Sequence, residues 1–364
     1  MAIQTALDSI SNSSGSPFGF KNRIINGAMV IDQRNAGAAL NSAASGSYGV
    51  DRFVFVKSGS AAFNIQQSAG SVTPPAGFAK YLGFTVGTGA TVNSGDYYLI
   101  QHKIEGHNFA DMAYGTANAA TTTLSFWVRS SLTGTFSGSY RTDVSTRTRP
   151  FTYTISSANT WEQKSITVTG DTSGTWGTTN NLGLEVNFNL GVGSTFLGTD
   201  GVWAGSTYFG ATGSVNVAAT TGATFYITGV QLEKGSTATS FDYRPYGTEL
   251  ALCQRYFEKS QPQGSAVAGG TAEYFFIGSN FRGSSLLMRY PLKWAVTKRA
   301  QPTVTFYNPR SGGTASQITT ASADYSATTA ANLLDSGMEV QGTTNSGGAS
   351  GDAAYVNWTA SSEL

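Results

Sequence analysis

Acid–base and nucleophilic chemistry has few candidate residues in this chain. The sequence contains two histidines, His102 and His107, which lie on either side of Glu105. A Ser-His-Asp arrangement needs a histidine base, and no Gly-x-Ser-x-Gly elbow between a strand and a helix accompanies these two. Isolated histidines in a β-rich chain are more often surface or packing groups. The sequence therefore predicts no catalytic residues and no enzyme.

Carboxylate chemistry is the main alternative to that prediction. Glycoside hydrolysis needs two carboxylates that flank the bond to be cleaved. The 21 acidic residues form no outstanding cluster, and the long parallel β-helix repeat of many polysaccharide-degrading proteins is absent. A polysaccharide depolymerase is kept as the less favoured alternative.

The sequence contains no motif for binding a metal, a phosphate group or a nucleic acid. Cys253 is the single cysteine, so neither an intrachain disulfide nor a thiolate cluster can form. No Gly-x-x-x-x-Gly-Lys-Ser/Thr loop occurs. The net charge is +1, from 22 basic and 21 acidic side chains, and the densest basic run, residues 141–149, also contains Asp143. We expect no metal, no cofactor and no nucleic-acid partner.

Aromatic and amide side chains offer a different chemistry, the binding of sugars. In the strand pattern of residues 124–129, Trp127 and Arg129 point away from the apolar face. Trp161 likewise opposes the apolar residues of its strand pattern. A flat aromatic ring and polar groups suit the apolar C–H face and hydroxyl rim of a sugar. The candidate carbohydrate-binding residues are Trp127, Arg129, Trp161, Glu185, Asn187 and Asn189. The alternative is that both tryptophans pack under loops or against a neighbouring subunit.

The elements that must position these residues are mostly strands. Only 12% of the residues are charged, and glycine reaches 44 residues, which is typical of a β-rich chain with many turns. Residues 124–129 and 182–190 alternate between apolar and polar, and residues 166–168 and 224–228 add further strands. The pattern predicts an all-β fold, with a jelly-roll β-sandwich over residues 21–246.

A short helix and a second β domain are expected to follow. Residues 248–259 have helical spacing, with Thr248 as the cap and Cys253 as a small core residue. This linking helix is assigned to 247–260. Residues 261–364 read as a C-terminal β domain, in which Leu333, Leu334, Met338 and Val340 are the apolar anchors of a thinly apolar stretch.

The first 20 residues form a separate element. Helical spacing places Ile3, Ala6, Leu7 and Ile10 on one face, and a helix this short needs a partner surface. We interpret it as an attachment segment, although a frayed terminus would look the same. The sequence has neither the start of a secretory signal nor a stretch of 18 apolar residues. We therefore expect synthesis in a reducing cytoplasm without membrane insertion.

Several motifs carry a family resemblance. They are residues 22–29 (NRIINGAM), 31–35 (IDQRN), 124–131 (LSFWVRSS), 134–136 (GTF), 227–235 (ITGVQLEKG), 243–246 (YRPY), 249–257 (ELALCQRYF) and 358–364 (WTASSEL). Jointly they resemble a module of bacteriophage tail fibres and other virion appendages, which is similar to carbohydrate-binding jelly rolls. That resemblance implies a commonly trimeric virion protein without enzyme activity. In such jelly rolls, acidic residues that hold calcium often stand where this chain has Ala28 and Gly229.

The combined expectation is a structural tail fibre or spike subunit that displays a glycan-binding type of β module for host-surface attachment. We expect a homotrimer in the virion, assembled in the host cytoplasm, that docks on other tail or capsid proteins and contacts a host surface glycan. The alternative in a different class is a head fibre, decoration or collar protein with a purely structural role.

Overall fold

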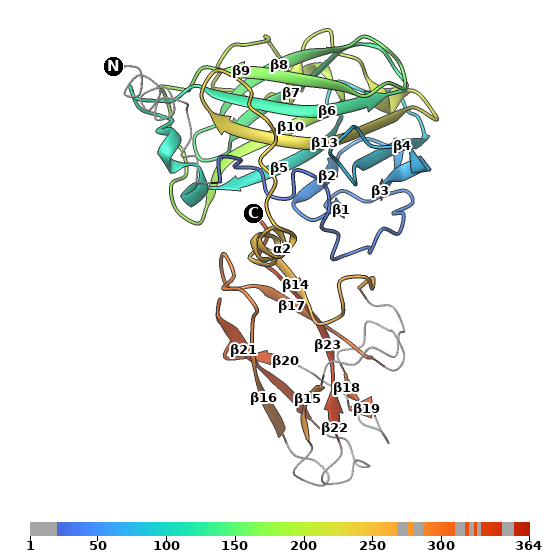
Figure 1. Cartoon of the computed structure of the whole chain (residues 1–364), viewed down its shortest axis with the longest axis vertical. Helices are drawn as coiled ribbons and strands as arrows, with labels where there is room; N and C mark the ends of the chain where they lie inside the picture. Colours follow the sequence, from blue (N-terminus) through green and yellow to red (C-terminus); the bar gives the residue numbers. More distant parts are fainter. Residues whose placement is uncertain are drawn as a thin grey trace, which may run out of the picture. The chain divides into compact units, whose positions relative to one another are not determined.

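The computed structural model describes residues 20–267, 276–279, 287–309, 317–319, 324–325, 329–343 and 353–364 (Figure 1). The expected attachment helix, with Ile3, Ala6, Leu7 and Ile10, lies outside these residues. The chain divides into two compact units. The first comprises residues 1–30, 39–245 and 364, and the second comprises residues 31–38 and 246–363.

The first unit is a sandwich of two antiparallel sheets, which we name after a central strand of each. The β10 sheet has the order β1 (Ser47–Val50), β2 (Phe53–Lys57), β5 (Tyr97–Glu105), β10 (Leu182–Val192), β7 (Gly134–Thr142) and β8 (Arg147–Ile155). The β6 sheet has the order β3 (Ala62–Gln67), β4 (Leu82–Thr88), β13 (Thr224–Lys234), β6 (Thr122–Ser130) and β9 (Glu162–Val168). A parallel pair, β11 (Leu197–Gly198) and β12 (Gly210–Ala211), and short 3-10 turns complete the unit.

Aromatic side chains from both sheets fill the sandwich core. Phe126 of β6 packs edge-on against Phe188 of β10 with ring centroids 5.1 Å apart, and both are fully buried. Leu124 and Val128 share that inner face with Phe126. The alternation of residues 124–129 and 182–190 therefore predicted the inward-facing side chains correctly.

The second unit also consists of antiparallel sheets. Its three described sheets are β14 (Phe257–Lys259), β23 (Asn357–Ser361) and β17 (Thr303–Tyr307); β15 (Phe276–Ser279), β22 (Ala353–Tyr355), β18 (Ile318–Thr319) and β19 (Asp324–Tyr325); and β16 (Leu287–Lys293), β21 (Gly337–Thr343) and β20 (Thr329–Ala331). Met338 and Val340 are buried in its core. Together with the sandwich, these sheets confirm the predicted class: all-β, with a jelly-roll sandwich, a short helix and a second β domain.

The helix is shorter than the sequence pattern indicates. Helix α2 spans Tyr246–Gln254, whereas we expected it to continue to Lys259. Phe257, Glu258 and Lys259 instead pair with β23, because backbone pairing to the last strand competes with one further helical turn. Cys253 is buried, as predicted for a core residue.

Residues 31–38 pack within the second unit, although they come early in the chain. The Gln33 side chain donates to the Phe257 carbonyl at 2.7 Å. The Arg34 guanidinium lies 3.7 Å from the centroid of the Phe257 ring and pairs with Glu363 at 2.9 Å. The predicted jelly-roll range, 21–246, includes these residues, and the domain boundaries stay a prediction.

One buried histidine ties the start of the sandwich to its core. His102 of β5 is fully buried, and its Nε2 lies 3.2 Å from the Ile25 nitrogen and 3.1 Å from the Ile25 oxygen. Its ring also packs against Phe53. Burial and, after it, the nearby Arg52 hold the pKa of His102 well below its ordinary value. His102 is therefore neutral in the folded sandwich.

This neutral histidine predicts a stability loss in acid. The unfolded chain takes up a proton at His102 below about pH 6.5, and the folded chain does not, so the free energy of unfolding should fall as the pH drops, by up to about 1.4 kcal/mol per unit. Denaturant unfolding from pH 8 to pH 4 measures this slope, which should decrease in His102→Gln. The exposed His107→Gln is the control. An unchanged slope in His102→Gln would contradict the assignment.

Candidate functional site

The sequence-predicted sugar-binding residues lie on two different sheets. Trp127 and Arg129 are on β6, and Trp161 immediately precedes β9, in the β6 sheet. Glu185, Asn187 and Asn189 are on β10, which pairs with β5 and β7 in the other sheet. The expectation that the β6 and β10 strands adjoin is wrong. Both groups point away from the shared core, so they lie on opposite outer faces of the sandwich.

The β10 group forms a buried polar network. Arg141 donates to both carboxylate oxygens of Glu185 at 3.2 Å, and Gln101 donates to Oε1 at 3.2 Å. The Asn187 amide donates to the same Oε1 at 2.8 Å and to Ser139 at 3.2 Å. Glu185 and Asn187 are at most 1% exposed. The polar groups of this network therefore hydrogen-bond mainly to one another.

A cover of the chain's own residues lies over this outer face. Asn189 donates to Ser137 of β7 and to Ser214 beyond β12. A side chain at Gly210 of β12 would approach the Asn189 amide to 2.6 Å, so glycine allows β12 to pack directly on β10. Phe209 packs with Leu99 and Val192 in the same layer. Among the described residues, none bonds the buried Oδ1 of Asn187. The β10 residues thus expose no surface to a ligand in this arrangement.

The outer face of the β6 sheet is organised around a glycine bulge. The pairing of β13 with β6 shifts register between Thr228 and Gln231, and Gly229 there has φ +61°. A Cβ at Gly229 would lie 2.6 Å from the Phe78 ring and 3.1 Å from the Trp127 ring. Only glycine lets both rings approach the strand here.

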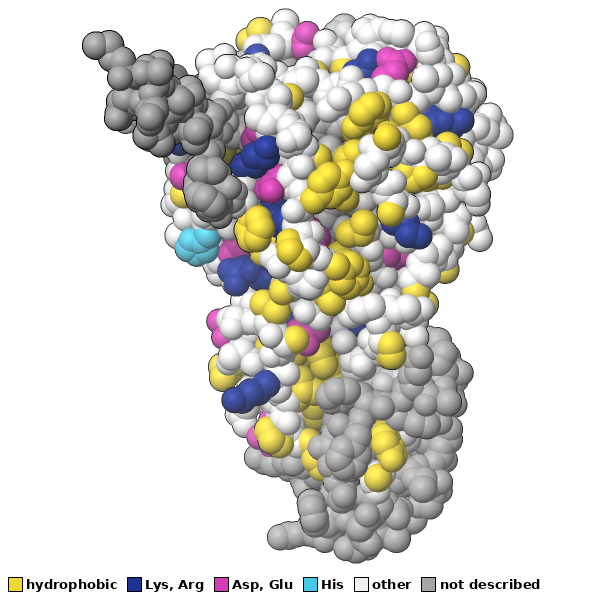
Figure 2. All heavy atoms as spheres, in the orientation of Figure 1, with side chains coloured by type: hydrophobic (Ala, Val, Ile, Leu, Met, Phe, Trp, Pro, Cys, Tyr) yellow, Lys and Arg dark blue, Asp and Glu magenta, His cyan; other side chains and the backbone are white. Residues whose placement is uncertain are grey.

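Four side chains form what we call the aromatic patch: Phe78, Trp127, Phe241 and Tyr243. The Phe78 ring lies 5.1 Å from that of Phe241 and 5.6 Å from that of Tyr243, and Phe241 and Tyr243 are 4.7 Å apart. Tyr243 is 55% exposed, and its hydroxyl donates to the Gly77 carbonyl at 2.5 Å. Phe78, Trp127 and Phe241 are half-buried, so the patch is an ordered aromatic cluster whose most exposed ring is that of Tyr243. Figure 2 shows apolar side chains gathered on one face of the sandwich.

Polar groups border the aromatic patch. Gln163 of β9 pairs directly with Trp127 across the strands and is exposed. Asp242 stands between Phe241 and Tyr243 and accepts from the backbone nitrogens of Lys21 and Asn22 at 2.9 and 3.2 Å. Lys80 is exposed beside the patch, and its carbonyl accepts from Thr228 at 2.7 Å. Donors and acceptors for hydroxyl groups thus stand next to flat rings.

Trp161 and Arg129 belong to a neighbouring, more enclosed cluster. The Trp161 indole nitrogen donates to the Thr73 carbonyl at 2.9 Å, and its ring lies 5.4 Å from that of Tyr81. Arg129 donates to the Asn159 carbonyl at 3.0 Å and lies 5.4 Å from the centroid of the Tyr226 ring. Trp161 therefore packs against the loop at residues 72–75, which is the alternative that the sequence left open.

Sequence reasoning missed three members of the aromatic patch. Phe78 stands in a loop after Pro74-Pro75 without periodicity, and Phe241 and Tyr243 follow the last strand of the sandwich. The motif at residues 243–246 contributes only to the family resemblance. Phe241 and Tyr243 stand two positions apart, and this alternation is the one sequence signal that could have indicated an exposed aromatic pair.

The described part of the chain offers neither a cluster of metal ligands nor a membrane-spanning helix. No group of three His, Cys, Asp or Glu side chains there could hold a metal ion. Within the same ranges, none of the helices combines the length and hydrophobicity that a bilayer-crossing helix needs.

Comparisons with solved structures give matches at low sequence identity and low TM-scores. No family model matches the chain, and no curated protein matches it. The enzymatically active domain of tailspike protein 4 of bacteriophage CBA120 is 14% identical with a TM-score of 0.29, over 54% of this chain and 21% of the tailspike chain. A family 4 carbohydrate-binding module is 14% identical with a TM-score of 0.29, over 58% of this chain and 99% of the module.

A family 11 carbohydrate-binding module from a Clostridium thermocellum cellulase is 11% identical with a TM-score of 0.27, over 55% of this chain and 98% of the module. This chain thus spans about a fifth of the tailspike and nearly all of each module. TM-scores below 0.5 do not by themselves establish a common fold. The sandwich is established by its own strand pairing.

The buried network on β10 predicts a structural role for Glu185. Glu185→Ala should lower the free energy of unfolding of the sandwich by about 1–3 kcal/mol, because Arg141, Gln101 and Asn187 lose a shared acceptor. Asp111→Ala is the control, because it removes an exposed ion pair with Arg23, worth less than about 1 kcal/mol. Chemical denaturation measures both changes. Equal small losses would show that the network contributes nothing to folding.

Proposed function

We propose that this chain is a non-enzymatic subunit of a bacteriophage tail fibre or spike, and that its sandwich binds a host-surface glycan on the aromatic patch. The observation that carries the binding part is the cluster of Phe78, Trp127, Phe241 and Tyr243 on the outer face of the β6 sheet. Three of its rings are half-buried and Tyr243 is exposed, and a contiguous apolar patch at a surface marks a site of interaction.

The chemistry of the patch fits a sugar. A pyranose ring can lay its C–H face on the rings of Tyr243 and Phe78, and its hydroxyls can reach the polar border. Gln163 supplies an amide that both donates and accepts, and Lys80 supplies a donor. The tyrosine hydroxyl is fixed by its bond to Gly77, so the ring is held in place before a ligand arrives, which lowers the entropic cost of binding.

The appendage part of the proposal is supported by the sequence resemblance, above all by residues 22–29, 227–235 and 243–246. Single-site affinity for a sugar should be weak, since hydroxyls lose water as they gain partners. A homotrimer, presented in several copies on a virion, would make attachment effective through multivalency. Residues 1–20 would dock the subunit on another virion protein.

The first test of this function compares substitutions of two exposed tyrosines, one in the aromatic patch and one outside it. Tyr243→Ala should reduce binding of the purified protein to an array of bacterial surface polysaccharides at least tenfold, because it removes the most exposed ring of the patch. Tyr246→Ala is the matched control, since it is the same residue type at 54% exposure, three positions along the chain. It should bind like the unaltered protein.

Trp127→Ala should give the same loss of binding while changing stability by no more than about 1 kcal/mol, the range of a surface substitution. Binding that survives both Tyr243→Ala and Trp127→Ala would exclude the aromatic patch. A protein that binds no polysaccharide on the array would leave a purely structural virion role as the better account.

The second test concerns the place on the particle. Deletion of residues 1–20 should yield a folded protein that no longer enters virions, as measured by immunoblotting of purified particles. Immunogold labelling of unaltered particles should decorate the tail. Normal incorporation of the truncated protein would refute the attachment role, and labelling of the capsid would favour a head fibre or decoration protein.

A further inference from the structure

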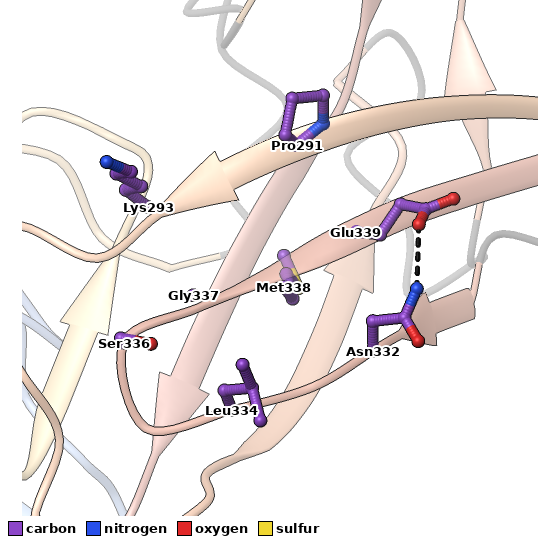
Figure 3. Close-up of a pocket in the computed structure, with 8 residues that line it drawn as sticks. All are labelled: Pro291, Lys293, Asn332, Leu334, Ser336, Gly337, Met338 and Glu339. Atoms are coloured by element: carbon purple, nitrogen blue, oxygen red, sulfur yellow. Dashed lines mark hydrogen bonds between the residues drawn. The ribbon is translucent and has the colours of Figure 1, made fainter.

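The second unit contains a cavity that the proposed function does not use (Figure 3). It has a volume of about 640 Å³, within the range of roughly 300–1,000 Å³ that is usual for small-molecule sites. Its walls come from the end of β16, from the turn that joins β20 to β21, and from the first residues of β21. All of these elements lie in one sheet of one unit.

The turn at residues 332–336 is held rigidly by backbone hydrogen bonds. The Trp294 indole nitrogen donates to the Leu334 carbonyl at 3.1 Å, and the Trp294 backbone nitrogen donates to the Ser336 carbonyl at 3.3 Å. The backbone nitrogen of Lys298 donates to the Asp335 carbonyl at 2.8 Å, and that of Leu334 donates to the Gly337 carbonyl at 2.8 Å. The cavity wall is therefore formed before any ligand arrives.

This rigid turn presents an apolar side chain to solvent. Leu334 is 60% exposed, the largest exposed fraction of any large apolar side chain in the described part of the chain. The sequence predicted it as a core anchor, which is wrong. Its backbone is tied to Trp294 and Gly337, while Leu334 lines the cavity together with the exposed Pro291. An apolar floor is thus exposed at a fixed position.

Polar groups stand at the two ends of that floor (Figure 3). At one end, Asn332 donates to Oε2 of Glu339 at 2.9 Å, and Gln341 donates to Oε1 at 3.2 Å. Asn332 adopts a left-handed φ of +46°, a conformation that asparagine tolerates better than most residues. A carboxylate oxygen can accept more than one hydrogen bond, so the oriented Glu339 can still accept from ligand hydroxyls.

The other end of the floor carries the ammonium group of Lys293. Lys293 is exposed, and no side chain or carbonyl of the described residues hydrogen-bonds or ion-pairs with its ammonium group. It offers donors to ligand oxygens, while Glu339 and Asn332 offer acceptors, and Ser336 adds a hydroxyl. The exposed Asp335 lies in the same turn, and this negative charge together with Glu339 disfavours an anionic ligand.

We propose that this cavity is a second saccharide site, which takes a neutral hexopyranose. The C–H face of the sugar lies on Leu334 and Pro291. Vicinal hydroxyls donate to Glu339 and accept from Lys293. The site lies wholly within the second unit, so the proposal does not depend on the aromatic patch.

Saturation-transfer NMR on the full-length chain tests the site. The probes are the methyl α-D-glycosides of glucose, galactose and mannose at millimolar concentration, with D-glucuronate as the charged counterpart. At least one neutral glycoside should receive saturation, and more strongly than glucuronate. Leu334→Ala and Glu339→Gln should each reduce that signal at least fivefold, and Lys293→Met should reduce it as well.

Val202→Ala is the matched control, because it shortens an apolar side chain of 51% exposure in the sandwich and should leave the signal unchanged. Thermal unfolding checks that the variants fold. The proposal is overturned if no neutral glycoside gives a Leu334-dependent signal, or if glucuronate gives the stronger one.

Tyr243→Ala separates this proposal from the proposed function. If Tyr243→Ala removes the saturation-transfer signal and Leu334→Ala leaves it intact, the cavity site is refuted and the aromatic patch is supported. If Leu334→Ala removes the signal and Tyr243→Ala leaves it intact, the aromatic patch is refuted and the cavity site is supported.

Discussion

The contact between Phe126 and Phe188 fixes which way both central strands face. The two rings meet edge to face at 5.1 Å between the sheets, within the buried core of the sandwich. Because side chains alternate along a strand, this contact turns Trp127 outward on one side. For the same reason it turns Asn187 and Asn189 outward on the other side. The two candidate groups of the sequence are therefore separated by the full thickness of the core.

The two outer faces use their polar and aromatic residues differently. On the β10 sheet, Glu185 gathers hydrogen bonds from Arg141, Gln101 and Asn187, and the segment around Phe209 and Gly210 covers them. Burial of such groups is tolerable because they pair with one another. On the β6 sheet, the bulge at Gly229 brings Phe78 next to Trp127, and Tyr243 stays exposed. The second face is the one that leaves ring surface for a ligand.

Local patterns predicted the strands and much of the core, but not the site. Alternation placed Phe126 and Phe188 correctly, because alternate residues of a strand share one face and the apolar set is the one that is buried. Strand order depends on pairing between distant segments, so Trp127 and Glu185 could not be assigned to separate sheets. The end of the helix at Gln254 was missed because β14 pairs with the last strand, more than 100 residues further on. Leu334 was misplaced because the bonds that hold its turn come from Trp294 and Lys298, which no local pattern connects to it.

Hydrogen–deuterium exchange of the full chain, with and without a bound polysaccharide identified on the array, tests the central claim most directly. If the glycan lies on the aromatic patch, backbone amides of residues 76–81 and 239–244 should become protected, because these segments carry Phe78, Phe241 and Tyr243. Amides of residues 197–211, which cover the β10 sheet, should exchange as before. Protection confined to residues 197–211, or their faster exchange as the cover opens, would contradict the account and place the glycan on the opposite face.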